Sequence, residues 1–318
     1  MKAAEKHEIR RQTACPACES SSCAPTSISG QSFSICPTCG CVFANPIPQE
    51  DSDSAGFYLR DNPSISDAMA EVEKCKVRIG EIERFKRRGT LMDIGAGLGY
   101  MVKAAEDKGW QAVGCDLSPS CCEFGVRTLG VRLFDCDYDK LPGESGLGTV
   151  DVITANYVLE HLPSPSEFVR FARQTLRTGG LAVIEIPNLL SFESLYLGES
   201  WHGLALPHHV TFFTPESLSR LFSPGFRIIL VEYSIADYFH QNVAPYLHRL
   251  AIDERLIDRL ARQFSGTAMV AYIEKTGEEQ LASPRGGMTE TVKKTLPYRA
   301  ARRLWRVLRS RTGTGLSP

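Results

Sequence analysis

Residues 91–99 contain the feature that most restricts the fold of this chain. The sequence Leu-Met-Asp-Ile-Gly-Ala-Gly-Leu-Gly joins an apolar run, typical of a buried strand, to a glycine-rich turn that opens a helix. Glycine at such a turn lets a ligand approach the backbone without a Cβ atom in the way. In open α/β folds this junction lies at the carboxyl edge of a parallel sheet, where small molecules bind. The stretch therefore predicts an α/β fold with a small-molecule site.

The residues around the turn indicate which small molecule it binds. Gly95 and Gly97 have the spacing of a dinucleotide site, but Gly99 comes one residue too early for G-x-G-x-x-G. Asp93 stands two residues before the first glycine, where it would repel a pyrophosphate and attract an ammonium group. Further along, Asp116 follows a second apolar run, and a carboxylate there can hydrogen-bond both hydroxyls of a ribose. An amino-acid ammonium group and a ribose together indicate S-adenosylmethionine.

Four motifs in order resemble those of the class I S-adenosylmethionine-dependent methyltransferases. They are residues 91–99, 113–119, 150–162 and 176–188. The resemblance implies a Rossmann-like α/β fold with a seven-stranded, mostly parallel sheet, covered by a helix over 64–88. The strands are expected at residues 90–94, 111–115, 131–134, 150–155, 181–186, 223–231 and 266–273, with the last two at an antiparallel end. The alternative is an NAD-dependent sugar oxidoreductase, because a Rossmann-like domain also suits that cofactor.

The same resemblance implies how the donor is held. Leu117 packs on the adenine ring, Asp137 accepts a hydrogen bond from the adenine amino group, and Tyr138 lies beside the ring. The neighbouring Asp135 could take the place of Asp137, so this register stays open. Residues 156–157, at the end of the fourth strand, face the sulfonium. The expected donor-binding residues are Asp93, Gly95, Ala96, Gly97, Gly99, Asp116, Leu117, Asp137, Tyr138, Asn156 and Tyr157.

Residues 189–215 are the expected acceptor side, because aromatic residues and histidines gather in this insertion. Residues 209–218 resemble a His-Leu-x-x-Phe-x-Pro pattern of a bacterial subgroup of these methyltransferases, which selects His209. Histidine has a suitable pKa for deprotonating a hydroxyl, so we expect His209 to be the base and oxygen to be the atom methylated. The alternates are His161, His202 and His208. Two other roles stay open. One is that His209 fixes its loop by hydrogen bonds, and the other is that Glu160 and His161 cap the helix that follows them.

The N-terminal region contains two C-x2-C pairs separated by seventeen residues, which is a zinc-ribbon spacing. The pairs are Cys15-Pro-Ala-Cys18 and Cys36-Pro-Thr-Cys39. Four thiolates complete a tetrahedral shell, so we expect a structural Zn²⁺ ion, with a short hairpin over 26–35 between the pairs. Cys23 and Cys41 lie nearby and stay open as replacement ligands. The run 36–48 also resembles a bacterial methyltransferase subgroup with such a ribbon, often found in polysaccharide or natural-product pathways.

Composition limits the partners and the location. The 318 residues carry a net charge of −1 and 43% hydrophobic residues, which does not indicate a nucleic-acid partner. The N-terminus lacks the apolar core of a signal peptide, and no run reaches the length of a membrane span, which predicts a cytoplasmic location. Residues 291–318 hold eight basic residues and no acidic one, in an amphipathic pattern that suits the inner membrane surface or docking on the protein itself.

We therefore expect four segments in this chain. They are a zinc-ribbon module (1–50), a linker and covering helix (51–89), a methyltransferase domain (90–275), and a polar linker with a basic tail (276–318). The predicted reaction transfers a methyl group to a small-molecule or glycan-type acceptor. A second alternative is an RNA- or protein-directed methyltransferase that uses the ribbon for docking. No sequence feature indicates the oligomeric state.

Overall fold

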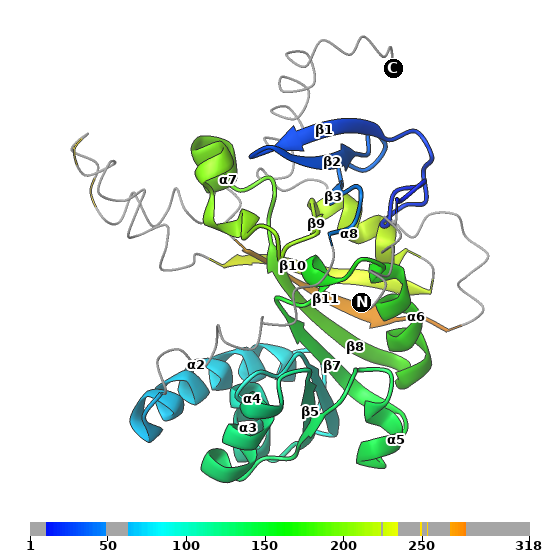
Figure 1. The fold of residues 1–318 in the computed structure, drawn as a ribbon. Coiled ribbons are helices and arrows are strands. Elements are labelled where there is room, and N and C mark those ends of the chain that lie inside the picture. The colour runs from blue at the N-terminus through cyan, green and yellow to red at the C-terminus, as the bar shows by residue number, and fades with distance from the viewer. Residues whose placement is uncertain are drawn as a thin grey trace, which may run out of the picture.

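The computed structural model describes residues 11–48, 63–223, 225–234, 249, 253 and 268–277. Its centre is a sheet with the strand order β10-β11-β8-β7-β4-β5-β6 (Figure 1). Strands β4 to β8 of this sheet pair in parallel, and β11 is antiparallel to both of its neighbours. The strands are β4 (Thr90–Ile94), β5 (Gln111–Asp116), β6 (Leu133–Asp135), β7 (Val150–Asn156), β8 (Leu176–Pro187), β10 (Phe226–Ser234) and β11 (Ala268–Lys275). The predicted seven-stranded α/β fold is confirmed, although β8 begins at Leu176 rather than at residue 181.

Helices cover both faces of this sheet. One face carries α2 (Ile65–Glu83), α3 (Tyr100–Asp107) and α4 (Pro119–Phe124), and the other carries α5 (Leu141–Ser145), α6 (Pro165–Thr175) and α8 (Pro215–Phe222). Successive strand residues point to opposite faces, so Leu91 joins the apolar cluster of α2 and α3 while Met92 joins that of α6 and α8. The predicted covering helix is α2, which begins at a Ser64 capping box and packs on α3.

The N-terminal module forms a second, smaller sheet. The predicted hairpin is present as β1 (Ala24–Ile28) and β2 (Gln31–Ile35), and β3 (Val42–Ala44) follows it. The fourth strand of this sheet, β9 (Thr211–Phe212), comes from the expected acceptor insertion. Figure 1 shows the module beside β9 and α8, near one end of the central sheet. The module and the insertion therefore share one sheet, which the sequence did not predict.

A shared apolar cluster explains this docking. Phe33 and Val42 of the module are buried with Trp201, Val210 and Phe212 of the insertion, and the rings of Phe33 and Phe212 lie 5.8 Å apart. Burying these side chains together removes apolar surface from water on both partners. The insertion also contains α7 (Phe192–Leu197) and two short 3-10 turns, η3 (Gly198–Ser200) and η4 (His202–Leu204).

The C-terminal expectations fall largely outside the described part of the chain. This holds for the basic segment 291–318 and for nearly all of the stretch between β10 and β11. Within the described ranges, no helix has both the length and the apolar character that crossing a bilayer requires.

Candidate active site

The glycine turn between β4 and α3 forms the centre of the candidate site. Gly95, Gly97 and Gly99 have φ angles of +65°, +52° and +84° in the left-handed region that favours glycine. A Cβ atom on Gly95 would lie 2.5 Å from Cγ2 of Val158, so a side chain does not fit there. At Gly97, by contrast, no described atom beyond its two chain neighbours lies within 4 Å of where a Cβ would be. The backbone at Gly97 is therefore open to a ligand.

Two carboxylates flank this turn at the carboxyl ends of neighbouring strands. Asp93 is 3% exposed, and its Oδ1 accepts a 2.6 Å hydrogen bond from Oγ1 of Thr154 on β7. Burial raises the pKa of Asp93 to about 7, although the Thr154 hydrogen bond opposes the shift. Asp116 ends β5, and its two oxygens accept hydrogen bonds from the backbone N–H groups of Gly97 (2.8 Å) and Ser118 (2.9 Å). Asp116 therefore holds the glycine turn in position from the neighbouring strand.

The residues expected around the adenine lie on the segments that follow β5 and β6. Leu117 is 73% exposed, which is unusual for a large apolar side chain and suits one that packs on a ligand. Asp137 is exposed two residues after β6, and its Oδ1 accepts a hydrogen bond from the N–H of Tyr138. The ring of Tyr138 packs edge-on against Phe168 and Phe171 of α6. The adenine roles of these residues stay predictions.

Asn156 and Tyr157, at the end of β7, are the residues expected to face the sulfonium. Tyr157 has a φ of +55°, a strained conformation for a non-glycine residue, and is 39% exposed. Its hydroxyl donates a 3.3 Å hydrogen bond to Glu185 of β8, whose other oxygen accepts one from Arg78 of α2. Burial raises the pKa of Tyr157, so its hydroxyl stays protonated. The covering helix thus helps to fix Tyr157 through Glu185.

Two of the four candidate histidines come together beside a buried carboxyl group. Glu160 and His161 lie on the 3-10 turn η2 (Leu159–His161), and His209 lies shortly before β9. The ring centroids of His161 and His209 are 4.7 Å apart. Nε2 of His209 lies 4.0 Å from Oε1 of Glu160. His202 and His208 are exposed and outside this cluster.

Each clustered histidine is fixed through its Nδ1 atom. Nδ1 of His209 lies 2.8 Å from the carbonyl oxygen of Gly203, and Nδ1 of His161 lies 3.1 Å from that of His208. A carbonyl oxygen can only accept, so each Nδ1 carries the proton and each Nε2 keeps a lone pair. Burial lowers the pKa of His161 and lowers that of His209 to about 4, so both imidazoles are neutral at pH 7.

Glu160 is the least solvated member of this cluster. Its side chain is buried, and neither carboxyl oxygen accepts a hydrogen bond from another described residue. Burial raises the pKa of Glu160 to about 8. Leaving a buried polar group without partners costs about 1–3 kcal/mol, so this carboxyl group needs a functional explanation.

Backbone hydrogen bonds tie the histidine cluster to the N-terminal module. The N–H of Val210 donates to the carbonyl of Glu160 (2.8 Å), and the N–H of Ala44 on β3 donates to the carbonyl of Val210 (2.8 Å). Oγ1 of Thr211 donates to the carbonyl of Leu162. The module therefore supports the segment that carries His209.

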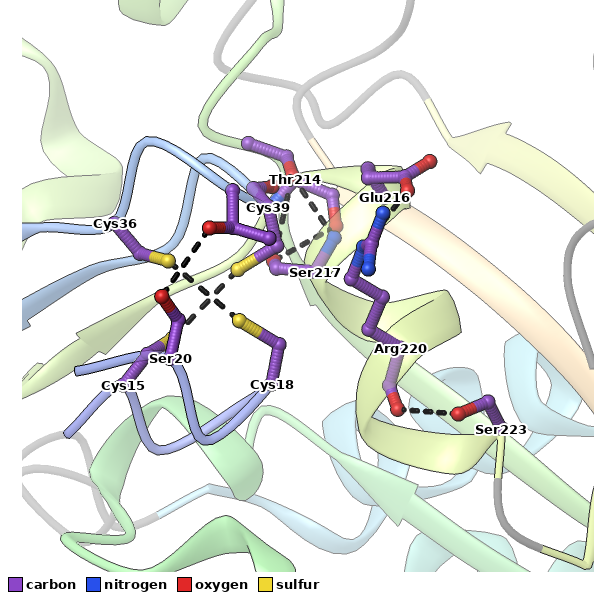
Figure 2. A network of polar contacts seen from close by, with 11 residues as sticks. Cys15, Cys18, Ser20, Cys36, Cys39, Thr214, Glu216, Ser217, Arg220 and Ser223 are labelled. Carbon is purple, nitrogen blue, oxygen red and sulfur yellow. Dashed lines mark hydrogen bonds and ion pairs between the residues drawn. The ribbon is translucent and has the colours of Figure 1, made fainter. Parts of the chain in front are cut away.

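The four predicted cysteine ligands also lie together, with their sulfur atoms facing one point (Figure 2). The Sγ–Sγ distances are 3.6 Å for Cys15 and Cys39 and 3.5 Å for Cys18 and Cys36. Thr214, which caps the N-terminus of α8, donates a 2.9 Å hydrogen bond to the carbonyl of Cys39 (Figure 2). Cys23 and Cys41, the two replacement ligands left open, are not part of this four-sulfur group.

Sequence reasoning missed two features of this site. It did not predict that the module would pair with the acceptor insertion, because β9 has only two residues and gives no periodic signal. It also gave Glu160 no more than a minor role, although a carboxyl residue next to a histidine is a visible signal.

Comparisons with known proteins agree with this geometry. A family model described as "Methyltransferase domain" matches residues 69–229. The chain is 30% identical over 129 residues to a ubiquinone biosynthesis O-methyltransferase of Paraburkholderia xenovorans, covering 37% of this chain and 53% of that protein. It is 30% identical over 156 residues to one of Burkholderia ambifaria, covering 44% and 65%. The chain thus spans between about half and two thirds of the length of these curated relatives.

Among solved structures, a chain from the Haloferax volcanii complex of the Trm112 activator with a putative methyltransferase superposes with a TM-score of 0.50. The sequence identity is 14%, and the match covers 72% of this chain and all of that one, which supports the fold alone. The family match decides against the NAD-dependent alternative. The chain therefore belongs to the methyltransferase domain family, with the fold of a class I S-adenosylmethionine-dependent methyltransferase.

Proposed function

We propose that this protein transfers a methyl group from S-adenosylmethionine to an oxygen atom of a small-molecule or glycan-type acceptor. The observation that carries the proposal is the glycine turn with a carboxylate on each side. Asp93 pairs with the ammonium group of the donor, Gly97 lets the donor approach the backbone, and Asp116 binds the ribose. Pairing with an ammonium group also compensates the burial of the Asp93 carboxylate.

The remaining donor contacts follow the carboxyl edge of the sheet. Leu117 and Tyr138 contact the adenine ring, and Asp137 accepts a hydrogen bond from the adenine amino group. Residues 156–157 lie beside the sulfonium. The exposure of Leu117 and the strained backbone of Tyr157 support these roles, because both features are unfavourable without a ligand.

Oxygen is favoured as the acceptor atom for two reasons. The curated relatives carry the name O-methyltransferase, and the site holds two neutral imidazoles. Methyl transfer needs the acceptor oxygen, the methyl carbon and the sulfur in line, with water excluded. His209 is the residue that we expect to act on the acceptor hydroxyl, since the Gly203 carbonyl fixes its Nδ1–H and leaves a lone pair on Nε2. A polysaccharide or natural-product setting, and membrane contact through residues 291–318, remain predictions.

The cysteine cluster fits a structural zinc ion. A tetrahedral site with Zn–S bonds of about 2.3 Å places its sulfur atoms about 3.8 Å apart. The distances of 3.5 and 3.6 Å are close to this value. We propose that Cys15, Cys18, Cys36 and Cys39 hold Zn²⁺, which stabilises the module and leaves no ligand position open for catalysis.

Mass spectrometry tests the proposed activity directly. The full-length protein is incubated with fractionated small-molecule and glycan extracts and donor labelled in its methyl group. We expect a labelled product whose methyl group is lost under conditions that cleave methyl ethers or esters. Label on nitrogen or carbon would refute oxygen methylation, and label in RNA or protein alone would refute the acceptor class. The matched control is Asp116→Asn, which we expect to give little product.

A further inference from the structure

We propose that Glu160, His161 and His209 form a second metal site, which binds a divalent transition-metal ion beside the methyl-transfer centre. One ligand atom from each of these three residues lies within 4.8 Å of the others. The site is separate from the cysteine cluster, and it rests on different observations. Its proposed role in the reaction rests on the function proposed above.

The hydrogen bonding of the two histidines prepares them for a metal ion. Histidines that bind metal usually donate their other ring N–H to a carbonyl or carboxylate, which fixes the tautomer and the ring orientation. His209 makes such a bond to Gly203, and His161 makes one to His208. Each ring thereby presents an unprotonated Nε2 atom, and Nε2 of His209 faces Oε1 of Glu160.

Glu160 provides the second, independent observation. Its side chain is 1% exposed, and both oxygens lack a hydrogen-bond partner among the other described residues. A carboxylate so placed, within 4.8 Å of a possible ligand atom of each imidazole, is satisfied by a cation. The 4.0 Å separation of Oε1 and Nε2 is wider than the roughly 3–3.5 Å expected for two neighbouring ligands of one ion. The two atoms would therefore move closer by about 0.5–1 Å on binding.

The chemistry of the three ligands selects the ion. Calcium and magnesium prefer oxygen ligands, whereas imidazole suits zinc, copper, iron and nickel, and the carboxylate also suits manganese. Two histidines and one carboxylate bind such ions with positions left open for other ligands. The carbonyl of Glu160 is itself held by the N–H of Val210, so the backbone around this ligand is fixed.

The position of the site suggests its role. Val158 contacts the glycine turn at Gly95, and Glu160 follows two residues later. An ion at this place binds the acceptor hydroxyl and lowers its pKa, as it does for bound water. The hydroxyl proton passes to a water molecule in another open position of the ion, so in this arrangement His209 serves as a ligand rather than as the base. The oxygen then forms a bond to the methyl carbon, and the carbon–sulfur bond breaks with its electron pair going to sulfur.

Manganese binding tests the site in the full-length protein. The protein is first loaded with one equivalent of zinc, which the four thiolates take up in preference to a site of two imidazoles and a carboxylate, and Mn²⁺ binding is then followed by electron paramagnetic resonance. We expect one Mn²⁺ ion per chain and at least tenfold weaker binding in Glu160→Gln and in His209→Ala. Glu123→Gln is the matched control, because Glu123 is an exposed residue of α4 paired with Arg127, and we expect wild-type binding.

Two readouts separate the possible outcomes. If the wild type binds no Mn²⁺ ion, or if both site variants bind it as tightly as the wild type, the metal site is refuted. The wild-type melting temperature should also rise with Mn²⁺, a measurement that does not depend on how the variants fold. Binding of S-adenosylhomocysteine is measured in the same samples. If S-adenosylhomocysteine binds while Mn²⁺ does not, only the metal inference fails. If Mn²⁺ binds while S-adenosylhomocysteine does not, the proposed function is refuted.

Discussion

Asp93→Asn gives a sharp test of the donor site, because it makes the free protein more stable and the complex weaker. The pKa of Asp93 is about 7 in the folded protein, against an ordinary value of 3.8. The folded state therefore binds this proton more tightly than the unfolded state, so Asp93 favours folding most at low pH. This contribution is lost as the pH rises from about 4 to about 7.

The size of the effect follows from the same shift. A difference of about three pKa units corresponds to roughly 4 kcal/mol, which is an upper limit because the buried site relaxes. Asparagine keeps the shape and can still accept the hydrogen bond from Thr154. We expect Asp93→Asn to raise the free energy of unfolding by about 1–3 kcal/mol at pH 8, with a smaller gain at pH 5. The negative charge of Asp116 also raises the pKa of Asp93, and the substitution removes the repulsion between the two carboxylates.

Denaturant unfolding between pH 5 and pH 8 and calorimetric titration measure the two halves of this prediction. The affinity for S-adenosylhomocysteine should fall about ten- to hundredfold, since a charge-assisted hydrogen bond is lost. Wild-type binding near pH 6 should release a proton, because pairing with the ammonium group lowers the pKa of Asp93, and the variant should release none. Glu123→Gln serves as the control with no pH-dependent difference. An equal loss of stability at every pH would refute the reasoning.

Three further substitutions test other parts of the site. Cys36→Ser should remove the bound zinc, measured by metal analysis, and lower the melting temperature, because metal binding contributes to folding; an unchanged zinc content would contradict the ligand assignment. Leu117→Ala should change the free energy of unfolding by less than about 0.5 kcal/mol, since the side chain is 73% exposed, yet weaken S-adenosylhomocysteine binding in calorimetry; unchanged affinity would remove it from the adenine site. His209→Ala should leave donor affinity nearly intact and slow turnover about 10²–10⁴-fold in the labelled-donor assay, whereas an unfolded variant would assign His209 a structural role.

The central sheet was predictable from the sequence because its signals are local. Each parallel strand is a short apolar run, and the glycines at 95–99 have an order that few folds share. The ends of strands were less predictable. The start of β8 at Leu176 was missed, because Gly179 and Gly180 interrupt the apolar run, Gly179 has a φ of +74°, and the pairing of β8 with β7 is irregular at this point.

The candidate site was predictable in part. The C-x2-C spacing correctly brought the four cysteines together, since a knuckle is a local structure. The pairing of β3 with β9 joins residues about 170 positions apart, and no local pattern encodes it. The isolation of Glu160 was also hidden, because it depends on packing from segments distant in the sequence.

Binding of the demethylated donor at the glycine turn tests the proposed donor site most directly. Calorimetric titration of the full-length protein with S-adenosylhomocysteine should show one site per chain, clearly weaker binding in Asp116→Ala, and no binding of reduced nicotinamide dinucleotide. Binding of the nicotinamide cofactor without S-adenosylhomocysteine, or an affinity unchanged by Asp116→Ala, would contradict the proposed donor site.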